Sequence, residues 1–256
     1  MSLKTLDNAL EILKFFTDET PAWGVRELAK ELDVSHSIIH RVLATYEKHG
    51  FLAQNQVTKK YVLGIKFWEY GQLVQKRLKL VDAIRPIMHR LCEDTGESVI
   101  LTILEGIEAV DIEIVESPQK VKYELTVGNR APLYVGASSK VLMAYLPEEK
   151  RAAVIEQGLS PYTANTIVDP EKLIEDLDNI KQQGWCYSRG EYFEDTFGIS
   201  IPLFNKNREI VASLSIAGPS YRMPEVKVQD ALHLLEKRGK EIQDCLSQIE
   251  VHPLFQ

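Results

Sequence analysis

The sequence lacks the features that mark several protein classes. Its 3 cysteines are too few and too scattered for a disulfide framework, and C-x-x-C zinc spacing is absent. No apolar run approaches the roughly 20 residues that a membrane-spanning helix needs, and the first residues do not follow the basic-then-apolar order of a secretory signal. We therefore expect a cytoplasmic protein with neither a membrane nor a metal among its partners.

Motifs of common enzyme families are missing too. The sequence has no G-x-S-x-G nucleophile elbow, no G-x-x-x-x-G-K-[ST] phosphate loop and no G-x-G-x-x-G dinucleotide fingerprint. Ser138 and Lys140 are two positions apart on an expected helix, so their side chains diverge and a Ser-Lys nucleophile pair is disfavoured. The sequence predicts no catalytic residue and no cofactor, and hence no enzyme.

Positive charge is in short supply and unevenly placed. The net charge is −7, of which residues 1–80 contribute +3 and residues 81–256 contribute −10. A small basic module on an acidic body can still dock on nucleic acid, because attraction to phosphate is local and is screened beyond roughly 8–10 Å in physiological salt. Net charge alone therefore decides nothing, although 256 residues favour two domains over one.

Apolar spacing predicts three helices in the first 50 residues. Residues 6–16 carry one apolar stripe at i, i+3, i+4 and i+7, and residues 25–32 repeat it over a shorter stretch. A third helix follows with Ser35 as its N-cap, whose side chain can accept a backbone N–H bond. It is expected to end at Gly50, which suits a left-handed C-terminal position.

The third helix has a core face and a polar face. Apolar spacing turns four side chains inward: Ile39, Val42, Leu43 and Tyr46. The polar side chains of the first two turns lie opposite, where a recognition helix meets the major groove, and they can donate to phosphates or base edges: these are His36, Ser37, His40 and Arg41. His36 and His40 could also chelate a metal at i, i+4, but metal sites need further ligands, so contact with DNA is favoured.

Residues 51–63 predict a β-hairpin with a polar turn over 55–58, and Lys59 and Lys60 lie near its tip. A lysine pair in a hairpin is usually only a solvated turn, but three helices and a basic hairpin within about 65 residues are typical of a winged helix-turn-helix. We therefore predict a DNA-binding domain over residues 1–65 with double-stranded DNA as its partner. The expected DNA contacts are Arg26, Ser35, His36, Ser37, His40, Arg41, Lys59 and Lys60.

The rest of the chain predicts a linker helix over 66–79 and an α+β domain over 80–256. Val110, Ile112 and Ile114 alternate as in a half-buried strand. Strands are expected over 98–104, 109–115, 123–127, 185–188, 199–204 and 210–216, and helices over 81–91, 138–145, 148–156, 171–183 and 226–249. This order indicates an antiparallel sheet that can carry a pocket. The free N–H groups where residues 136–139 open a helix suit a small anionic metabolite.

Ordered motifs resemble one family along nearly the whole chain. Residues 32–47 (LDVSHSIIHRVLATYE), Gly50-Phe51-Leu52 and residues 61–64 are similar to the DNA-binding domain of IclR-type transcriptional regulators, named after the isocitrate lyase regulator. Residues 127–134 (VGNRAPLY), 139–146 (SKVLMAYL), 184–191 and 216–219 resemble the effector domain of that family. An ordered set of this kind is far more specific than a lone helix-turn-helix.

The resemblance implies a GAF-like effector domain and a linker helix that helps to pair subunits into a homodimer or tetramer; the alternative is that this helix only tethers the two domains. It also implies the effector-contacting positions, which are Ala137 and Ser138 at the helix opening and Ser188, Gly198, Ser215 and Ala217 on the strands. Some relatives have an acidic residue at position 188 and cysteine at position 198, so a less charged and roomier cavity is expected. Tyr134, Met143 and Phe197 are candidate apolar walls, or ordinary core.

Other departures from the family pattern affect specificity. His36-Ser37-Ile38 stands where relatives commonly have Lys or Arg followed by Ser-Thr, and Ser139 replaces a frequent glycine. Operator preference therefore does not transfer. The prediction is a homodimeric regulator, a repressor rather than an activator, that senses an organic, keto or sugar acid. A metabolite-binding enzyme with an accessory helical domain and a pure dimerisation scaffold are the alternatives.

Overall fold

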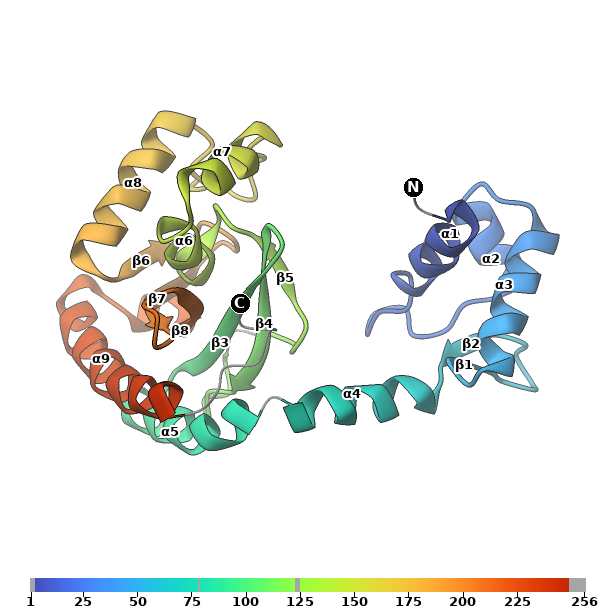
Figure 1. Cartoon of the computed structure of the whole chain (residues 1–256), viewed down its shortest axis with the longest axis horizontal. Helices are drawn as coiled ribbons and strands as arrows, with labels where there is room; N and C mark the ends of the chain where they lie inside the picture. Colours follow the sequence, from blue (N-terminus) through green and yellow to red (C-terminus); the bar gives the residue numbers. More distant parts are fainter. Residues whose placement is uncertain (1–2, 78, 123–124, 249–256) are drawn as a thin grey trace. The chain divides into compact units, whose positions relative to one another are not determined.

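The computed structural model describes residues 3–77, 79–122 and 125–248. The chain divides into two compact units, Met1–Arg77 and Leu78–Gln256 (Figure 1). Within the described residues, none of the helices combines the length and the apolar character needed to cross a membrane.

The amino-terminal unit is a helix-turn-helix followed by a β-hairpin. Its elements are α1 (Lys4–Leu13), α2 (Val25–Glu31), α3 (His36–Lys48), β1 (Leu52–Gln54), β2 (Tyr61–Leu63) and α4 (Ile65–Arg77). The predicted helices and hairpin are confirmed, with α1 ending at Leu13 rather than at Phe16. Phe16 is still buried, in the core that includes Leu28, Ile39 and Leu43. The apolar spacing therefore identified the buried sides of α2 and α3, but the stripe predicted for α1 is wrong in part, because Leu6 and Leu10 are exposed and Ile12, outside the stripe, is buried.

Of the two expectations about the ends of α3, the one for its start is wrong and the one for its end is confirmed. Ser35 occupies the N-cap position but makes no side-chain cap bond; its hydroxyl lies 3.3 Å from that of Ser37. The expected cap bond of Ser35 is therefore wrong. At the other end, Gly50 adopts φ +77°, as the left-handed position after a helix requires.

The end of α3 and the start of α4 are held together. A Cβ at Gly64 would lie only 2.2 Å from the Gly50 carbonyl oxygen, so this approach of two backbones requires glycine. The Gly64 N–H donates to the Phe51 carbonyl at 2.7 Å. The Phe51 ring stacks on Tyr70 with centroids 5.8 Å apart and meets Phe67 edge-on at 5.2 Å. The hairpin, α3 and α4 thus share one packed junction.

The carboxy-terminal unit is built on one antiparallel sheet with strand order β5-β4-β3-β8-β7-β6. The strands are β3 (Ser98–Glu105), β4 (Glu108–Val115), β5 (Arg130–Pro132), β6 (Cys186–Arg189), β7 (Thr196–Phe204) and β8 (Ile210–Pro219). The helices are α5 (Lys79–Thr95), α6 (Gly136–Ala144), α7 (Glu148–Glu156), α8 (Pro170–Gln183) and α9 (Glu225–Gln248). These elements confirm the α+β class.

The sheet is covered on both faces (Figure 1). Helices α5 and α9 pack together over one face, and the largest apolar core lies between them and the strands. Helix α6 lies on the other face against β6, β7 and β8, and α8 backs it. A second core fills the space around α6 and α8. The opening of α6 is therefore held directly above the sheet.

Two strand expectations are wrong. Residues 123–124 of the expected strand over 123–127 lie outside the described residues, and 125–127 are not in a strand. The edge strand is instead β5, because the chain turns at Gly128, which has φ +92°.

Alternation also breaks in β4: Leu101 pairs with Glu113 and Thr102 with Asp111, so Ile112 is the extra residue of a β-bulge. Residues 110, 112 and 114 therefore do not share one face.

Candidate functional site

Helix α3 presents the predicted polar face to solvent. Its core side is anchored by Ile39 and Leu43, both buried. His36, Ser37, His40 and Arg41 are all exposed. At 100° per residue, Ser37 and Arg41 lie opposite the buried pair, and the two histidines lie together on one side of them. The first two turns of α3 thus expose one continuous face of hydrogen-bond donors.

The two lysines of the hairpin have different surroundings. The Lys60 ammonium lies 2.7 Å from Glu27 Oε1 on α2. The pKa of Glu27 is lowered by that bond and by the hydrogen bond from the Gly24 N–H. Lys60 therefore ties the hairpin to α2. Lys59 is exposed and adopts φ +58°, and Arg26 on α2 is exposed as well.

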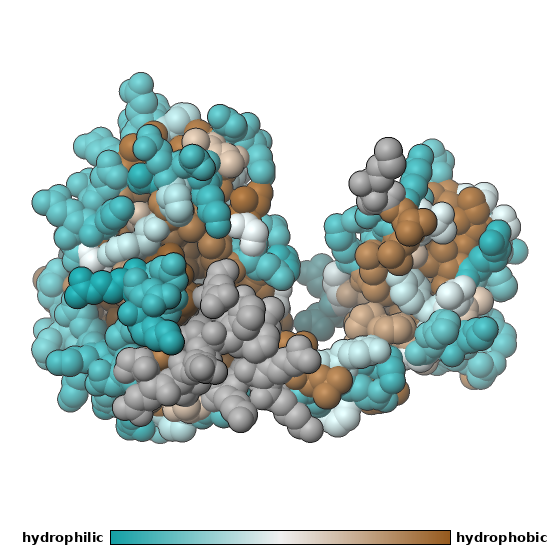
Figure 2. Space-filling model, viewed as in Figure 1, coloured by the Kyte–Doolittle hydropathy of each residue, from teal (hydrophilic) through white to brown (hydrophobic). Residues whose placement is uncertain are grey.

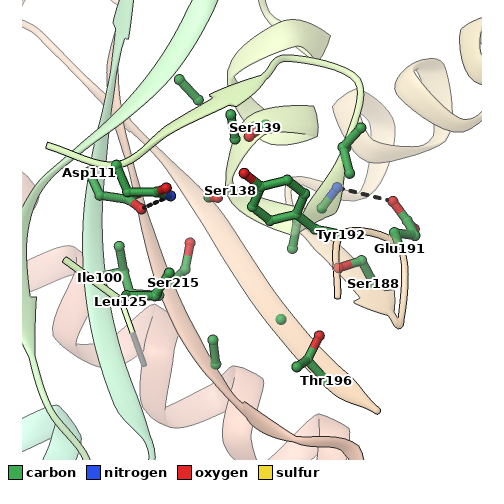
Figure 3. A pocket seen from close by; sticks show the side chains of 18 of the residues that line it. Ile100, Asp111, Leu125, Ser138, Ser139, Ser188, Glu191, Tyr192, Thr196 and Ser215 are labelled. Atoms are coloured by element: carbon green, nitrogen blue, oxygen red, sulfur yellow. Dashed lines mark hydrogen bonds between the residues drawn. The ribbon is translucent and has the colours of Figure 1, made fainter. Parts of the chain in front are cut away.

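A pocket lies between the opening of α6 and the sheet (Figure 3). It has a volume of ≈ 70 Å³. A single water needs roughly 10–15 Å³ on this scale, so the space suits a small organic molecule rather than a nucleotide. The six expected effector positions all line it: Ala137, Ser138, Ser188, Gly198, Ser215 and Ala217.

Glycine at position 198 does not simply enlarge the pocket. A Cβ there would lie 3.2 Å from the Ala137 Cβ and 3.5 Å from Ser188 Oγ, so α6 approaches β7 closely at this point. The expected extra room is partly occupied by α6. Of the three candidate apolar walls, Phe197 lines the pocket, whereas Tyr134 and Met143 belong to the core around α6 and α8.

Sequence reasoning missed Asp111, a buried carboxylate on the pocket wall. Its side chain lies on the same side of β4 as that of Ala109, which also lines the pocket, and the residue is only 8% exposed. Thr102 Oγ1 donates to Asp111 Oδ1 at 2.8 Å, and Asn129 Nδ2 donates to Oδ2 at 3.1 Å. Burial raises the pKa of Asp111, and these two hydrogen bonds oppose that rise. An acidic residue inside a run of β-branched residues was the available signal.

A second missed carboxylate, Glu191, belongs to a buried ion cluster at the opposite end of the pocket (Figure 3). The Lys140 ammonium, on a residue 1% exposed, lies 2.7 Å from Glu191 Oε1 and 2.9 Å from Asp176 Oδ2. Burial disfavours the charged form of Lys140, but the negative groups around it outweigh burial and raise its pKa. The Gly136 N–H donates to Glu191 Oε2 at 3.2 Å. Glu191 thus occupies the first free N–H of α6.

The described pocket lining contains Asp111 and Glu191 but no Lys, Arg or His. Positive potential for an anion therefore comes from the remaining N–H groups at the start of α6. Among the described residues, no group of three or more His, Cys, Asp or Glu is placed to hold a metal ion. The site is thus suited to reversible binding through hydrogen bonds.

Comparison with known proteins gives the same result for both units. Residues 5–56 match the IclR helix-turn-helix domain, and residues 72–244 match the C-terminal domain of the bacterial transcriptional regulator IclR. The chain is 34% identical over 239 residues to the HTH-type transcriptional regulator KipR of Bacillus subtilis, covering 93% of each chain. It is 26% identical to the transcriptional repressor IclR of Escherichia coli, covering 94% of this chain and 89% of that one.

A solved structure shares the fold along almost the whole chain. An IclR homologue from Microbacterium hydrocarbonoxydans, crystallised with 4-hydroxybenzoate, superposes with a TM-score of 0.82 at 24% identity. The match covers 94% of this chain and 98% of that one. The similarity extends over both units and not over one domain alone.

Proposed function

The chain belongs to the IclR family of bacterial transcriptional regulators, which bind DNA and respond to ligands, and on that premise we propose which of its surfaces perform each task. The matched relatives are regulators, so the alternative of an enzyme with an accessory helical domain is not favoured. A cytoplasmic location stays a prediction. Because the E. coli relative is a named repressor, repression is the proposed direction of control.

The DNA-reading surface is the exposed face of α3 with the hairpin beside it. Ser37 and Arg41 point away from the buried side of α3, so their donors can reach base edges when the helix lies in the major groove. Lys59 is exposed on the hairpin and suits a flanking phosphate. Lys60 is held by Glu27 and acts mainly by positioning the hairpin. The remaining proposed contacts are Arg26, Ser35, His36 and His40.

The proposed working form is a homodimer. Apolar side chains are exposed on two helices of the amino-terminal unit: Leu3, Leu6 and Leu10 at or before α1, and Ile65, Trp68 and Leu73 on α4. Figure 2 shows brown patches on the surface of this unit. Burying them against a second copy would remove this surface from water. Two recognition helices would then meet half-sites one helical turn apart, about 34–36 Å. A further step to a tetramer stays a prediction.

The pocket is proposed to bind a small carboxylate. What carries this proposal is that six positions chosen by family resemblance line one pocket at the start of α6. The N–H groups of Ala137 and Ser138, at the first turn, have no acceptor within the helix and suit the carboxylate. Hydroxyls of Ser138, Ser188 and Ser215 can hydrogen-bond the rest of the ligand. The ligand of the solved homologue, 4-hydroxybenzoate, is also a carboxylate.

Regulation requires that the effector distinguish two arrangements of the dimer. A ligand shifts an equilibrium only by its difference in affinity for the two states. Occupation of the pocket would therefore favour the arrangement whose recognition helices do not match the operator spacing.

The test is binding of the full chain to the DNA upstream of its own reading frame, measured by fluorescence anisotropy while carboxylates are added. Ser138→Leu places a larger apolar side chain at the pocket opening. This variant should retain DNA affinity and lose the response to the active carboxylate. Ser160→Leu, on an exposed loop outside the pocket lining, is the matched control and should respond normally. An unchanged dose response in Ser138→Leu would contradict the proposed pocket.

A further inference from the structure

Asp111 has unused capacity to accept hydrogen bonds inside the pocket. A carboxylate offers about four lone-pair positions, and the two contacts of the Asp111 carboxylate come from Thr102 and Asn129. Both donors are neutral, so neither cancels the charge of the carboxylate. Asn129 also lines the pocket beside it. A charged acceptor therefore faces the space where a ligand would lie.

Glu191 provides the contrast within the same pocket. It also accepts two hydrogen bonds, but one comes from the Lys140 ammonium, so its charge is already balanced. Asp111 lies at the other end (Figure 3). Of the two carboxylates, Asp111 is therefore the one whose charge a donor on the ligand would stabilise most.

A ligand can add a hydrogen bond to the Asp111 carboxylate only if the ligand carries a donor group. A buried charged acceptor facing an apolar or accepting group is left unsatisfied, which costs more than a missing contact at the surface. A methylene or a keto oxygen placed against Asp111 creates that situation, and a hydroxyl or ammonium group removes it. The pocket should therefore discriminate between ligands of equal size by this one group.

We propose that Asp111 accepts a hydrogen bond from the effector, and that the effector is a small carboxylate bearing a hydroxyl or ammonium group. The inference rests on the proposed function of the pocket: the start of α6 takes the ligand carboxylate and Asp111 takes the donor. Simple alkyl acids and keto acids are excluded as best ligands, and hydroxy acids or amino acids are selected.

Matched series of carboxylates test this on the full chain by calorimetric titration. Propionate, pyruvate, lactate and alanine differ only at the second carbon, and butyrate with its 2-oxo, 2-hydroxy and 2-amino derivatives forms a larger set. Within the set that binds, the hydroxy or amino acid should bind about 10-fold to 100-fold more tightly than the alkyl and keto acids, as hydrogen bonds to charged groups imply. Equal or better binding of the alkyl or keto acid would overturn the inference.

The variant Asp111→Asn keeps the size of the side chain and removes its charge. Preference for the amino acid should fall to about twofold or less, and preference for the hydroxy acid should narrow, because an amide oxygen still accepts. Glu113→Gln is the matched control. Glu113 lies on the same strand, but its carboxylate pairs with Arg85 on α5. Its replacement should leave the preference for hydroxy and amino acids unchanged.

A purely structural role for Asp111 predicts a different result. Asp111→Asn would then lower the melting temperature while the ratio of affinities within a series stayed as in the wild type, and that outcome would overturn the inference. If all members of a series bound with equal affinity, the inference about Asp111 would be wrong, but the proposal that the pocket binds a carboxylate would remain. If every member of both series failed to bind a chain that still binds its DNA, the carboxylate pocket and the inference would fall together.

Discussion

The two units hold their charges in opposite ways. The candidate DNA contacts of the amino-terminal unit, such as His36, Arg41 and Lys59, are exposed. The charges around the pocket are buried, and Lys140 and Glu191 are paired at 2.7 Å. Exposed charges act over a Debye length and weaken with salt, whereas buried charges act at contact and depend on geometry. The first arrangement suits a long charged polymer, and the second suits selection of one small molecule.

The largest effect is expected from breaking the buried cluster. Lys140→Met leaves Glu191 buried without its cation, which should lower the free energy of unfolding by about 3–5 kcal/mol. Urea unfolding followed by circular dichroism measures this. Arg151→Met is the control, because it removes a pair with Asp178, which is largely exposed, and should cost less than about 1 kcal/mol. Equal losses in the two variants would show that burial does not distinguish them.

A smaller effect is expected on the exposed side of the comparison. Arg41→Ala should weaken operator binding by about 1–3 kcal/mol, through loss of a contact to a base or a phosphate, without changing the unfolding transition. Anisotropy titrations at several salt concentrations measure the affinity and its salt slope. Lys14→Ala removes an exposed cation just after α1 that pairs with Glu11, and it serves as the control. Undiminished affinity in Arg41→Ala would refute the assignment of the α3 face.

A still smaller change sharpens the pocket side. Gly198→Ala places a Cβ 3.2 Å from the Ala137 Cβ, so α6 must shift by a few tenths of an ångström and effector affinity should fall by about 1 kcal/mol. Calorimetry measures the loss, and operator affinity should not change. Gly71→Ala on α4 is the control, since a Cβ there meets nothing within 4 Å. Unaltered effector affinity in Gly198→Ala would remove position 198 from the binding site.

The smallest effect concerns a thiol beside the cluster. Burial raises the pKa of Cys186 to about 12, so native protein at pH 8 should leave it unalkylated while urea-unfolded protein reacts. Mass spectrometry of peptides after iodoacetamide treatment distinguishes the two. The pKa of Cys186 is higher in the folded protein than in the unfolded chain. Its contribution to the free energy of unfolding is therefore fully present below about pH 8.5 and is lost as the pH rises toward 12. Rapid labelling of Cys186 in the native state would mean that the cluster opens.

The sequence predicted what depends on local patterns and missed what depends on pairing. The buried sides of α2 and α3 follow from helical spacing, although that of α1 does not, and the opening of α6 follows from its position in a known motif. Asp111 was missed because only the packing of α6 over the sheet shows that its side of β4 faces a pocket rather than solvent. Glu191 was missed because its partner Lys140 is 51 residues away. Lys59 and Lys60 are indistinguishable as letters, and only the approach of Glu27 separates them.

The junction around Gly50, Gly64 and Phe51 has a practical consequence for making chimeras between regulators. Because α4 packs through Phe67 and Tyr70 onto the same junction, α4 and the recognition helix should be exchanged together. A chimera joined at the end of the hairpin, near residue 64, would lose the native packing of Phe51 against α4. A cut after Arg77, where the first unit ends, would transfer the helix-turn-helix and the hairpin together with the α4 that packs on them.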